Sequence, residues 1–214
     1  PYTRSSDLSY IGINPFCTFK WQDGIAQLDG VQFRVDGMKY LSKLLDKYRF
    51  ENLTKLPFIS GAIGYFSYDF ARSIEKIPNL NEKDVDIPQC YFNFYDNIII
   101  IDNKENKTYI SACGKLESCE KSIDIIENAI LNCEKVKYPK YPTYEQGNEK
   151  FVSNFTREKY IKTLKKVREY IENGDIYITN LTQSFTVDTK KTPYETYKKL
   201  RFINPAPFAA YMNL

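Results

Sequence analysis

Histidine is absent from the sequence: none of the 214 residues is a histidine. This absence excludes Ser-His-Asp and Cys-His nucleophile systems, general acid–base catalysis by imidazole, and zinc sites that use imidazole ligands. Any chemistry carried by this chain must therefore rely on carboxylates, lysines, backbone amides or a bound cofactor.

The cysteines lack the spacing of a metal site. There are five, an odd number, and none forms a Cys-x-x-Cys pair: Cys17, Cys90, Cys113, Cys119 and Cys133. This pattern argues against a disulfide framework and against a zinc site. Because free cysteine usually behaves as a small apolar residue, we expect buried thiols, with Cys119 on the apolar face of a helix.

Long apolar runs and basic stripes are missing as well. No apolar run approaches the roughly 20 residues that span a bilayer, and the N-terminus lacks the apolar core of a signal peptide. The 30 basic and 27 acidic side chains are interspersed and leave a net charge of +3. We therefore expect a soluble, cytoplasmic protein that binds neither nucleic acid nor membrane.

The residues that are abundant favour sheets, since the chain contains 18 Tyr and 14 Phe. Three Asp-Gly pairs separate short apolar runs near the N-terminus, and Asp-Gly supplies the positive φ of tight hairpin turns. They are Asp23-Gly24, Asp29-Gly30 and Asp36-Gly37. The patterns predict strands at 8–16, 17–21, 25–28, 31–35, 57–69, 91–101, 107–113, 176–187 and 208–212. They predict helices at 38–48, 116–133, 156–173 and 193–202.

Gly61 and Gly64 lie three apart in an apolar stretch. Glycines inside a strand pattern indicate that another backbone or a large ring packs close by, which we expect here. The pair lacks both the Gly-Lys-Ser/Thr ending of a P-loop and the pattern of a dinucleotide-binding turn, so phosphate binding is not favoured.

Four carboxylates could be proposed as acid–base pairs: Asp69, Glu75, Glu172 and Asp175. Without a pocket, solvated or capping roles are favoured for them. For Asp175, which follows a helix-ending glycine, we expect the carboxylate to fix the turn by accepting backbone hydrogen bonds.

The domain organisation is indicated by a break in the pattern at 135–154, where prolines alternate with polar residues. We expect an N-terminal domain at 1–140, a linker at 141–154 and an incomplete second domain at 155–214. Since the sequence stops inside a predicted strand, we expect a fragment of a longer protein.

Three stretches carry a family resemblance. Residues 58–69, followed by Arg72, Glu75 and Pro78, resemble the motif F-x-G-G-x-x-G-Y-x-x-Y-D. Residues 170–185 resemble Y-I-x-x-G-D-I-Y-Q-x-N-L-[ST]-Q-R-F, with Ile178 and Ser184 in place of the glutamine and arginine. Residues 200–211 form the third stretch. The motif residues in the last two stretches are Gly174, Asp175, Asn180, Gln183, Asn204 and Pro205. Together the stretches resemble the chorismate-utilising enzymes, namely the large subunits of anthranilate synthase and aminodeoxychorismate synthase.

The resemblance implies an α+β fold of two packed antiparallel sheets flanked by helices, truncated here. The third stretch is closer to the aminodeoxychorismate branch. That branch forms 4-amino-4-deoxychorismate for folate synthesis from chorismate and from ammonia supplied by a glutaminase (glutamine amidotransferase) subunit. Two alternatives stay open: anthranilate synthase component I, and a non-catalytic module that folds and binds a partner.

The resemblance also implies where the site residues lie. In the family, chorismate and Mg²⁺ are held by two glutamates and a Pro-Ile-x-Gly-Thr segment, in which x is lysine in aminodeoxychorismate synthases and alanine in anthranilate synthases. Since that segment does not occur before Leu214, we expect no catalytic or metal-binding residue in this chain. Relatives bind tryptophan, and the matching positions are Ser5, Ser6, Asp7, Leu8, Pro207, Phe208 and Ala209. Plain core packing is the alternative role for these residues.

Overall fold

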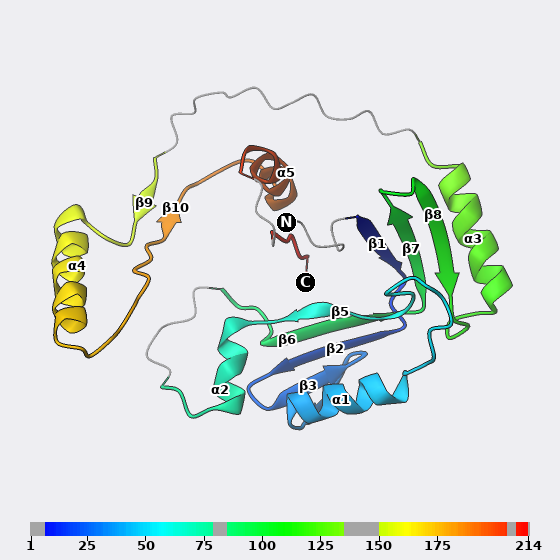
Figure 1. Ribbon diagram of the computed structural model, residues 1–214, viewed down its shortest axis with the longest axis horizontal. Helices are drawn as coiled ribbons and strands as arrows, with labels where there is room; N and C mark the ends of the chain where they lie inside the picture. The colour runs from blue at the N-terminus through cyan, green and yellow to red at the C-terminus, as the bar shows by residue number, and fades with distance from the viewer. Residues whose placement is uncertain (1–6, 79–84, 135–149, 205–208, 214) are drawn as a thin grey trace. The chain divides into compact units, whose positions relative to one another are not determined.

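The computed structural model describes residues 7–78, 85–134, 150–204 and 209–213 (Figure 1). The chain divides into two compact units, Pro1–Lys135 and Val136–Leu214. Each unit is described by itself.

A five-stranded antiparallel sheet forms the larger part of the first unit. Its strand order is β4-β3-β2-β6-β5. The strands are β2 (Cys17–Gln22), β3 (Ile25–Leu28), β4 (Val31–Arg34), β5 (Gly61–Phe66) and β6 (Cys90–Tyr95). The hairpin prediction is confirmed at Asp23-Gly24 and Asp29-Gly30, because all four residues have positive φ, as a two-residue turn of this kind requires.

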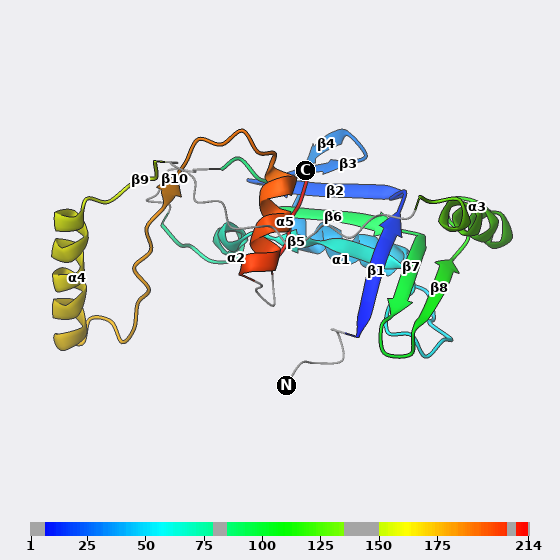
Figure 2. The same cartoon turned by 90° about the horizontal axis from the view of Figure 1, so that it is seen from above.

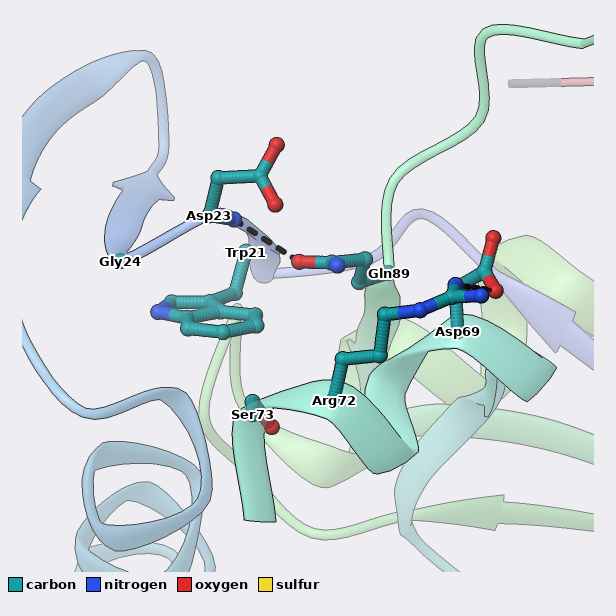
Figure 3. Close-up of a pocket in the computed structure, with 7 residues that line it drawn as sticks. All are labelled: Trp21, Asp23, Gly24, Asp69, Arg72, Ser73 and Gln89. Carbon is teal, nitrogen blue, oxygen red and sulfur yellow. Dashed lines mark hydrogen bonds and ion pairs between the residues drawn. The ribbon is translucent and has the colours of Figure 1, made fainter. Parts of the chain in front are cut away.

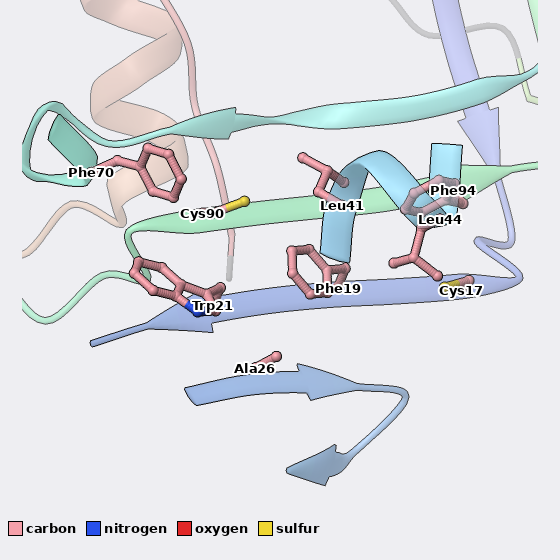
Figure 4. Packing of buried hydrophobic residues seen from close by; sticks show 9 residues of the cluster. All are labelled: Cys17, Phe19, Trp21, Ala26, Leu41, Leu44, Phe70, Cys90 and Phe94. Carbon is pink, nitrogen blue, oxygen red and sulfur yellow. The ribbon is translucent and has the colours of Figure 1, made fainter. Parts of the chain in front are cut away.

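Helix α1 (Gly37–Lys47) confirms the predicted helix and covers one face of this sheet. The core between them is apolar and largely aromatic (Figure 4): Cys17, Phe19, Trp21, Ala26, Leu41, Leu44, Phe70, Cys90 and Phe94. The predicted turn at Asp36-Gly37 is wrong. Asp36 caps α1 by accepting a hydrogen bond from the Lys39 N–H at 3.0 Å. A Cβ on Gly37 would lie 2.6 Å from the Trp21 ring, so glycine is required here by close packing.

The second sheet of this unit has three antiparallel strands in the order β1-β7-β8. They are β1 (Leu8–Ile13), β7 (Asn97–Asp102) and β8 (Lys107–Ala112), and helix α3 (Cys119–Leu131) packs against β8. Figure 2 shows these strands running across the direction of β2 and β6. The predicted α+β class, with antiparallel sheets flanked by helices, is confirmed.

The single strand predicted at 91–101 is wrong. The predicted strand is interrupted at Asp96. Strand β6, before this residue, belongs to the five-stranded sheet, and β7, after it, belongs to the three-stranded sheet. Asp96 is fully buried, and its carboxylate accepts hydrogen bonds from the backbone N–H groups of Cys113, Lys115 and Leu116 at 3.1, 2.8 and 3.0 Å. These three donors explain why a charged residue occupies the break.

The second unit contains α4 (Arg157–Glu172), α5 (Pro193–Ile203) and a two-stranded sheet of β9 (Val152–Ser153) and β10 (Phe185–Thr186). Both helices confirm the predictions, with Thr156 capping α4 and a capping box of Thr192 and Glu195 opening α5. Strand β9 lies within the range predicted as a linker.

Two of the strands predicted for the second unit are not formed as predicted. Within 176–187 only β10 is a strand, and the Tyr177 and Ile178 side chains are 94% and 75% exposed. Residues 209–213 form no strand. A strand needs a hydrogen-bonding neighbour, and β9 is the one neighbour that the described residues offer β10.

Candidate functional site

A cleft of about 560 Å³ opens at one end of the five-stranded sheet (Figure 3). It is lined by Trp21, Asp23, Gly24, Asp69, Arg72, Ser73 and Gln89. Trp21 belongs to β2, the Asp23-Gly24 turn follows that strand, and Gln89 directly precedes β6. The other three residues come from the 3-10 turn η2 (Tyr68–Phe70) and helix α2 (Ala71–Ile74).

Backbone bonds fix η2 and α2 over the end of the sheet. The predicted strand 57–69 ends as β5 at Phe66, and the Ser67 N–H then donates to the Gln89 carbonyl at 2.8 Å. Phe70 is buried and packs edge-on against the Trp21 ring at 5.4 Å between centroids. This apolar anchor places Asp69, Arg72 and Ser73 at the mouth of the cleft.

The polar groups of the cleft are held by specific partners. Arg72 forms an ion pair with Asp69, and the two side chains are 25% and 44% exposed. The Gln89 side chain is buried, and its Oε1 accepts a hydrogen bond from the Asp23 N–H at 2.8 Å. Trp21 donates its Nε1–H to the Val35 carbonyl at 2.8 Å. Among the residues that line the cleft, no nucleophile is paired with a general base.

The residues predicted to form a tryptophan pocket are only partly described. Ser5, Ser6, Pro207 and Phe208 lie outside the described residues. In the first unit the Asp7 carbonyl accepts a hydrogen bond from the Asn103 N–H, and Leu8 pairs with Asp102 at the start of β1. Ala209 is exposed in the second unit. The pocket stays a prediction.

The motif residues of the second unit have distinct local roles. Gly174 ends α4 with φ +78°, as predicted, and the Asp175 N–H donates to the Tyr170 carbonyl at 2.9 Å. Gln183 accepts a hydrogen bond from Ser153 at 3.2 Å, and Asn204 caps α5. Asn180 is exposed in irregular backbone, and Pro205 lies outside the described residues. Gly174 and Asp175 are neighbours in the sequence and lie in one turn. Within the described ranges, no hydrogen bond joins Asn180, Gln183 and Asn204 to one another.

The role expected for the Asp175 carboxylate is wrong. The turn is closed by backbone bonds, and the carboxylate accepts no hydrogen bond from the residues that the structure describes. Glu172 is exposed and pairs with Arg168 on the surface of α4, which agrees with a solvated role.

Sequence reasoning missed the cleft itself. Asp69 and Arg72 were visible in the first motif stretch, but Gln89 and Trp21 carry no local signal. They meet the other residues only because β2 pairs with β6 across more than 60 positions of sequence.

The sequence of this chain is similar to the sequences of known proteins. The profile of a family described as chorismate binding enzymes matches residues 4–214. The chain belongs to this chorismate-binding family. It is 31% identical over 231 residues to anthranilate synthase component 1 of Acetivibrio thermocellus, covering 95% of this chain and 45% of that protein. It is 28% identical over 221 residues to aminodeoxychorismate synthase component 1 of Bacillus subtilis, covering 98% and 46%.

A solved structure supports the fold assignment. The crystal structure of anthranilate synthase component I from Streptococcus pneumoniae superposes with a TM-score of 0.78 at 22% identity, over 97% of this chain and 48% of that one. The chain therefore has an anthranilate synthase component I-like fold. It spans about half the length of the relatives that it matches. No helix among the described residues is long and apolar enough to cross a membrane.

Proposed function

We propose that this chain is part of the large subunit of an aminodeoxychorismate synthase, which converts chorismate and ammonia to 4-amino-4-deoxychorismate. The observation that carries the proposal is the stretch Asn204-Pro205-Ala206-Pro207-Phe208-Ala209-Ala210-Tyr211, which resembles the aminodeoxychorismate branch of the family. The match to the Bacillus subtilis protein over 98% of this chain supports it.

The role proposed for this chain is that of a scaffold. Within the described ranges no three His, Cys, Asp or Glu side chains lie together in a group that could hold a metal ion. No reaction step through Mg²⁺ is assigned to these residues. The ligands of Mg²⁺ and of the chorismate ring are proposed to lie elsewhere in the protein.

A second candidate function is that of anthranilate synthase component I. The relative from Acetivibrio thermocellus favours it, since its identity of 31% exceeds that of the Bacillus subtilis protein. In both candidates the proposed partner is a glutaminase subunit that releases ammonia from glutamine. Tryptophan is the ligand proposed for the positions at 5–8 and 207–209.

The test uses the full-length protein that contains this chain. We expect lysine at the third position of its Pro-Ile-x-Gly-Thr segment, where an amine can act as a nucleophile on the ring. Purified enzyme with chorismate, Mg²⁺ and ammonium should yield aminodeoxychorismate, identified by chromatography and mass. Replacing the lysine with alanine should abolish that product without changing the circular dichroism. Anthranilate as the sole product, or alanine at that position, would favour the second candidate.

A further inference from the structure

We propose that a cavity beside the C-terminal end of α1, called here the aromatic cavity, binds a small carboxylic acid that carries a flat ring. The aromatic cavity has a volume of about 180 Å³ and lies within the first unit. Three of the residues that line it are aromatic, Phe16, Tyr48 and Phe50, and one is charged, Lys115. The proposal does not rest on the function proposed above.

The rings of the aromatic cavity come from separate parts of the first unit. Phe16 directly precedes β2, and Tyr48 is the residue at which α1 ends. These two rings pack edge-on against each other, with 5.0 Å between their centroids. Because the sheet and the helix hold them, this apolar wall is formed without a ligand, as is usual for small-molecule sites.

Phe50 supplies the outer wall from the segment that connects α1 with β5. The side chain of Asn52 holds this segment, since its Nδ2 donates to the Leu56 carbonyl at 2.7 Å and its Oδ1 accepts from the Thr54 N–H at 2.9 Å. The Phe50 side chain is 38% exposed. It can therefore be truncated without opening the core between α1 and the five-stranded sheet.

The size of the aromatic cavity fits one ring. An apolar protein cavity of about 150 Å³ holds a benzene molecule. A neighbouring cavity of about 310 Å³ shares Tyr48, Phe50, Ser60 and Gly61 with the aromatic cavity and offers room for a longer substituent. Aromatic walls favour a flat ring, because aromatic rings attract each other in edge-to-face and offset arrangements.

The charges of the lining favour an acid. Among the described residues that line the two cavities, the charged ones are Lys115 and Arg49, and both are basic. Arg49 pairs with Asp46 at 3.4 Å, whereas the Lys115 ammonium forms no ion pair within the part of the chain that the structure describes. The Asp96 carboxylate, which accepts the Lys115 N–H, is engaged by three backbone donors and is not part of the lining. A carboxylate on the ring would give the ammonium a partner.

The test uses three probes with the 214-residue chain: benzoate, its neutral amide benzamide, and acetate. Benzamide keeps the ring without the charge, and acetate keeps the charge without the ring. Saturation-transfer NMR titrations measure the three affinities without any activity assay. We expect saturable binding of benzoate, with benzamide and acetate each at least about tenfold weaker.

The first variant, Phe50→Ala, removes one aromatic wall and should weaken benzoate binding at least about fivefold. Leu53→Ala is its matched control, because Leu53 lies in the same segment, is 85% exposed and lines neither cavity. The affinity of the control for benzoate should be unchanged.

The second variant, Lys115→Gln, removes the charge and keeps most of the side chain. It should lower the affinity for benzoate to that for benzamide and leave the affinity for benzamide unchanged. Lys107→Gln, at an exposed position where β8 begins, is the control and should bind benzoate as the parent does.

Selective binding of benzoate that both variants weaken and both controls retain supports the proposal. Should Phe50→Ala not fold, Lys115→Gln decides alone, since Lys115 is exposed. No saturable binding, equal affinities for benzoate and benzamide, or full benzoate affinity in either folded variant would overturn the proposal.

Discussion

Gly64 shows how tightly the strands of the large sheet approach each other. It lies in β5 opposite Phe92 of β6. A Cβ at this position would lie 2.7 Å from the Phe92 Cα and would overlap the Tyr91 carbonyl oxygen. These neighbours are backbone atoms, which cannot move away as the end of a side chain can. The expectation that a backbone packs close to this glycine is confirmed.

We predict that Gly64→Val lowers the free energy of unfolding by about 3 kcal/mol or more, because the added volume must displace β6. The measurement is urea denaturation followed by circular dichroism. Gly24→Ala is the control: an added Cβ would meet only the Arg34 Nη1 atom at 3.9 Å, an ordinary contact, and the cost there is the left-handed φ of +86°, about 1–2 kcal/mol. Equal unfolding midpoints for the two variants would contradict the argument.

The buried thiols make the stability of the first unit depend on pH. Burial raises the pKa of Cys90 to about 12, and burial, with Asp29 adding to it, raises the pKa of Cys17 to about 11. The ordinary value, which we take for the unfolded chain, is close to 8.5. Both thiols therefore stay protonated in the folded state at a pH where the unfolded chain ionises.

The sign of the effect follows from this difference in pKa. The contribution of each thiol is fully present below about pH 8.5 and is lost as the pH rises toward 11–12, with a slope of at most about 1.4 kcal/mol per pH unit for each group. We predict that Cys90→Ala, although less stable than the parent at pH 7.5, approaches the parent's stability at pH 10.5. Urea denaturation at both values provides the test, and a constant gap between the two proteins would refute the prediction.

At the level of elements, Asp96 decides where one sheet ends and the other begins. Its carboxylate binds three backbone N–H groups that lie 17 to 20 positions later in the chain. The same residue separates β6 from β7 and, through these bonds, holds the segment between β8 and α3 in place. A neutral amide could accept bonds through only one of its two polar atoms.

We predict that Asp96→Asn destabilises the protein by about 2–3 kcal/mol, because at least one buried N–H loses a charged acceptor. Thermal unfolding with and without the substitution measures the effect. Asp46→Asn is the matched control, since Asp46 pairs with Arg49 on the surface, where both side chains are more than half exposed. That change should cost less than about 0.5 kcal/mol. A small effect at both positions would argue against the role of Asp96.

Whether a feature could be predicted depends on how far apart in the sequence its contacting residues lie. The Asp23-Gly24 hairpin, the helix predicted at 156–173 and the glycine that ends this helix depend on neighbours within a few residues, and all three were predicted. The interruption of the predicted strand at Asp96 depends on backbone amides that are distant in the sequence. It therefore could not be predicted from the apolar run around Asp96. The cleft likewise depends on Gln89 meeting Asp23, which is 66 positions away. Strand 176–187 failed because the alternation of its side chains does not reveal whether a neighbouring strand exists.

At the level of the whole molecule, burial is distributed unequally between the two units. All the buried residues among those described lie in the first unit, where aromatic rings fill the space between α1 and its sheet. In the described part of the second unit no residue is buried. Its helices carry apolar residues at helical spacing, yet Leu164 and Ile171 of α4 are 43% and 45% exposed.

This difference predicts unequal protection against hydrogen exchange in the 214-residue chain. Helices of this length are marginal in water when tertiary packing does not support them. The amides of β2 and β6 should exchange only through global unfolding, whereas those of α4 should exchange through local opening, at least about a hundredfold faster. Exchange followed by mass spectrometry of peptic peptides resolves the two segments, with the urea-unfolded chain as the reference for intrinsic rates. If α4 proved as slow to exchange as β2, the second unit would possess packing of its own, and the exposed apolar faces of its helices would require another explanation.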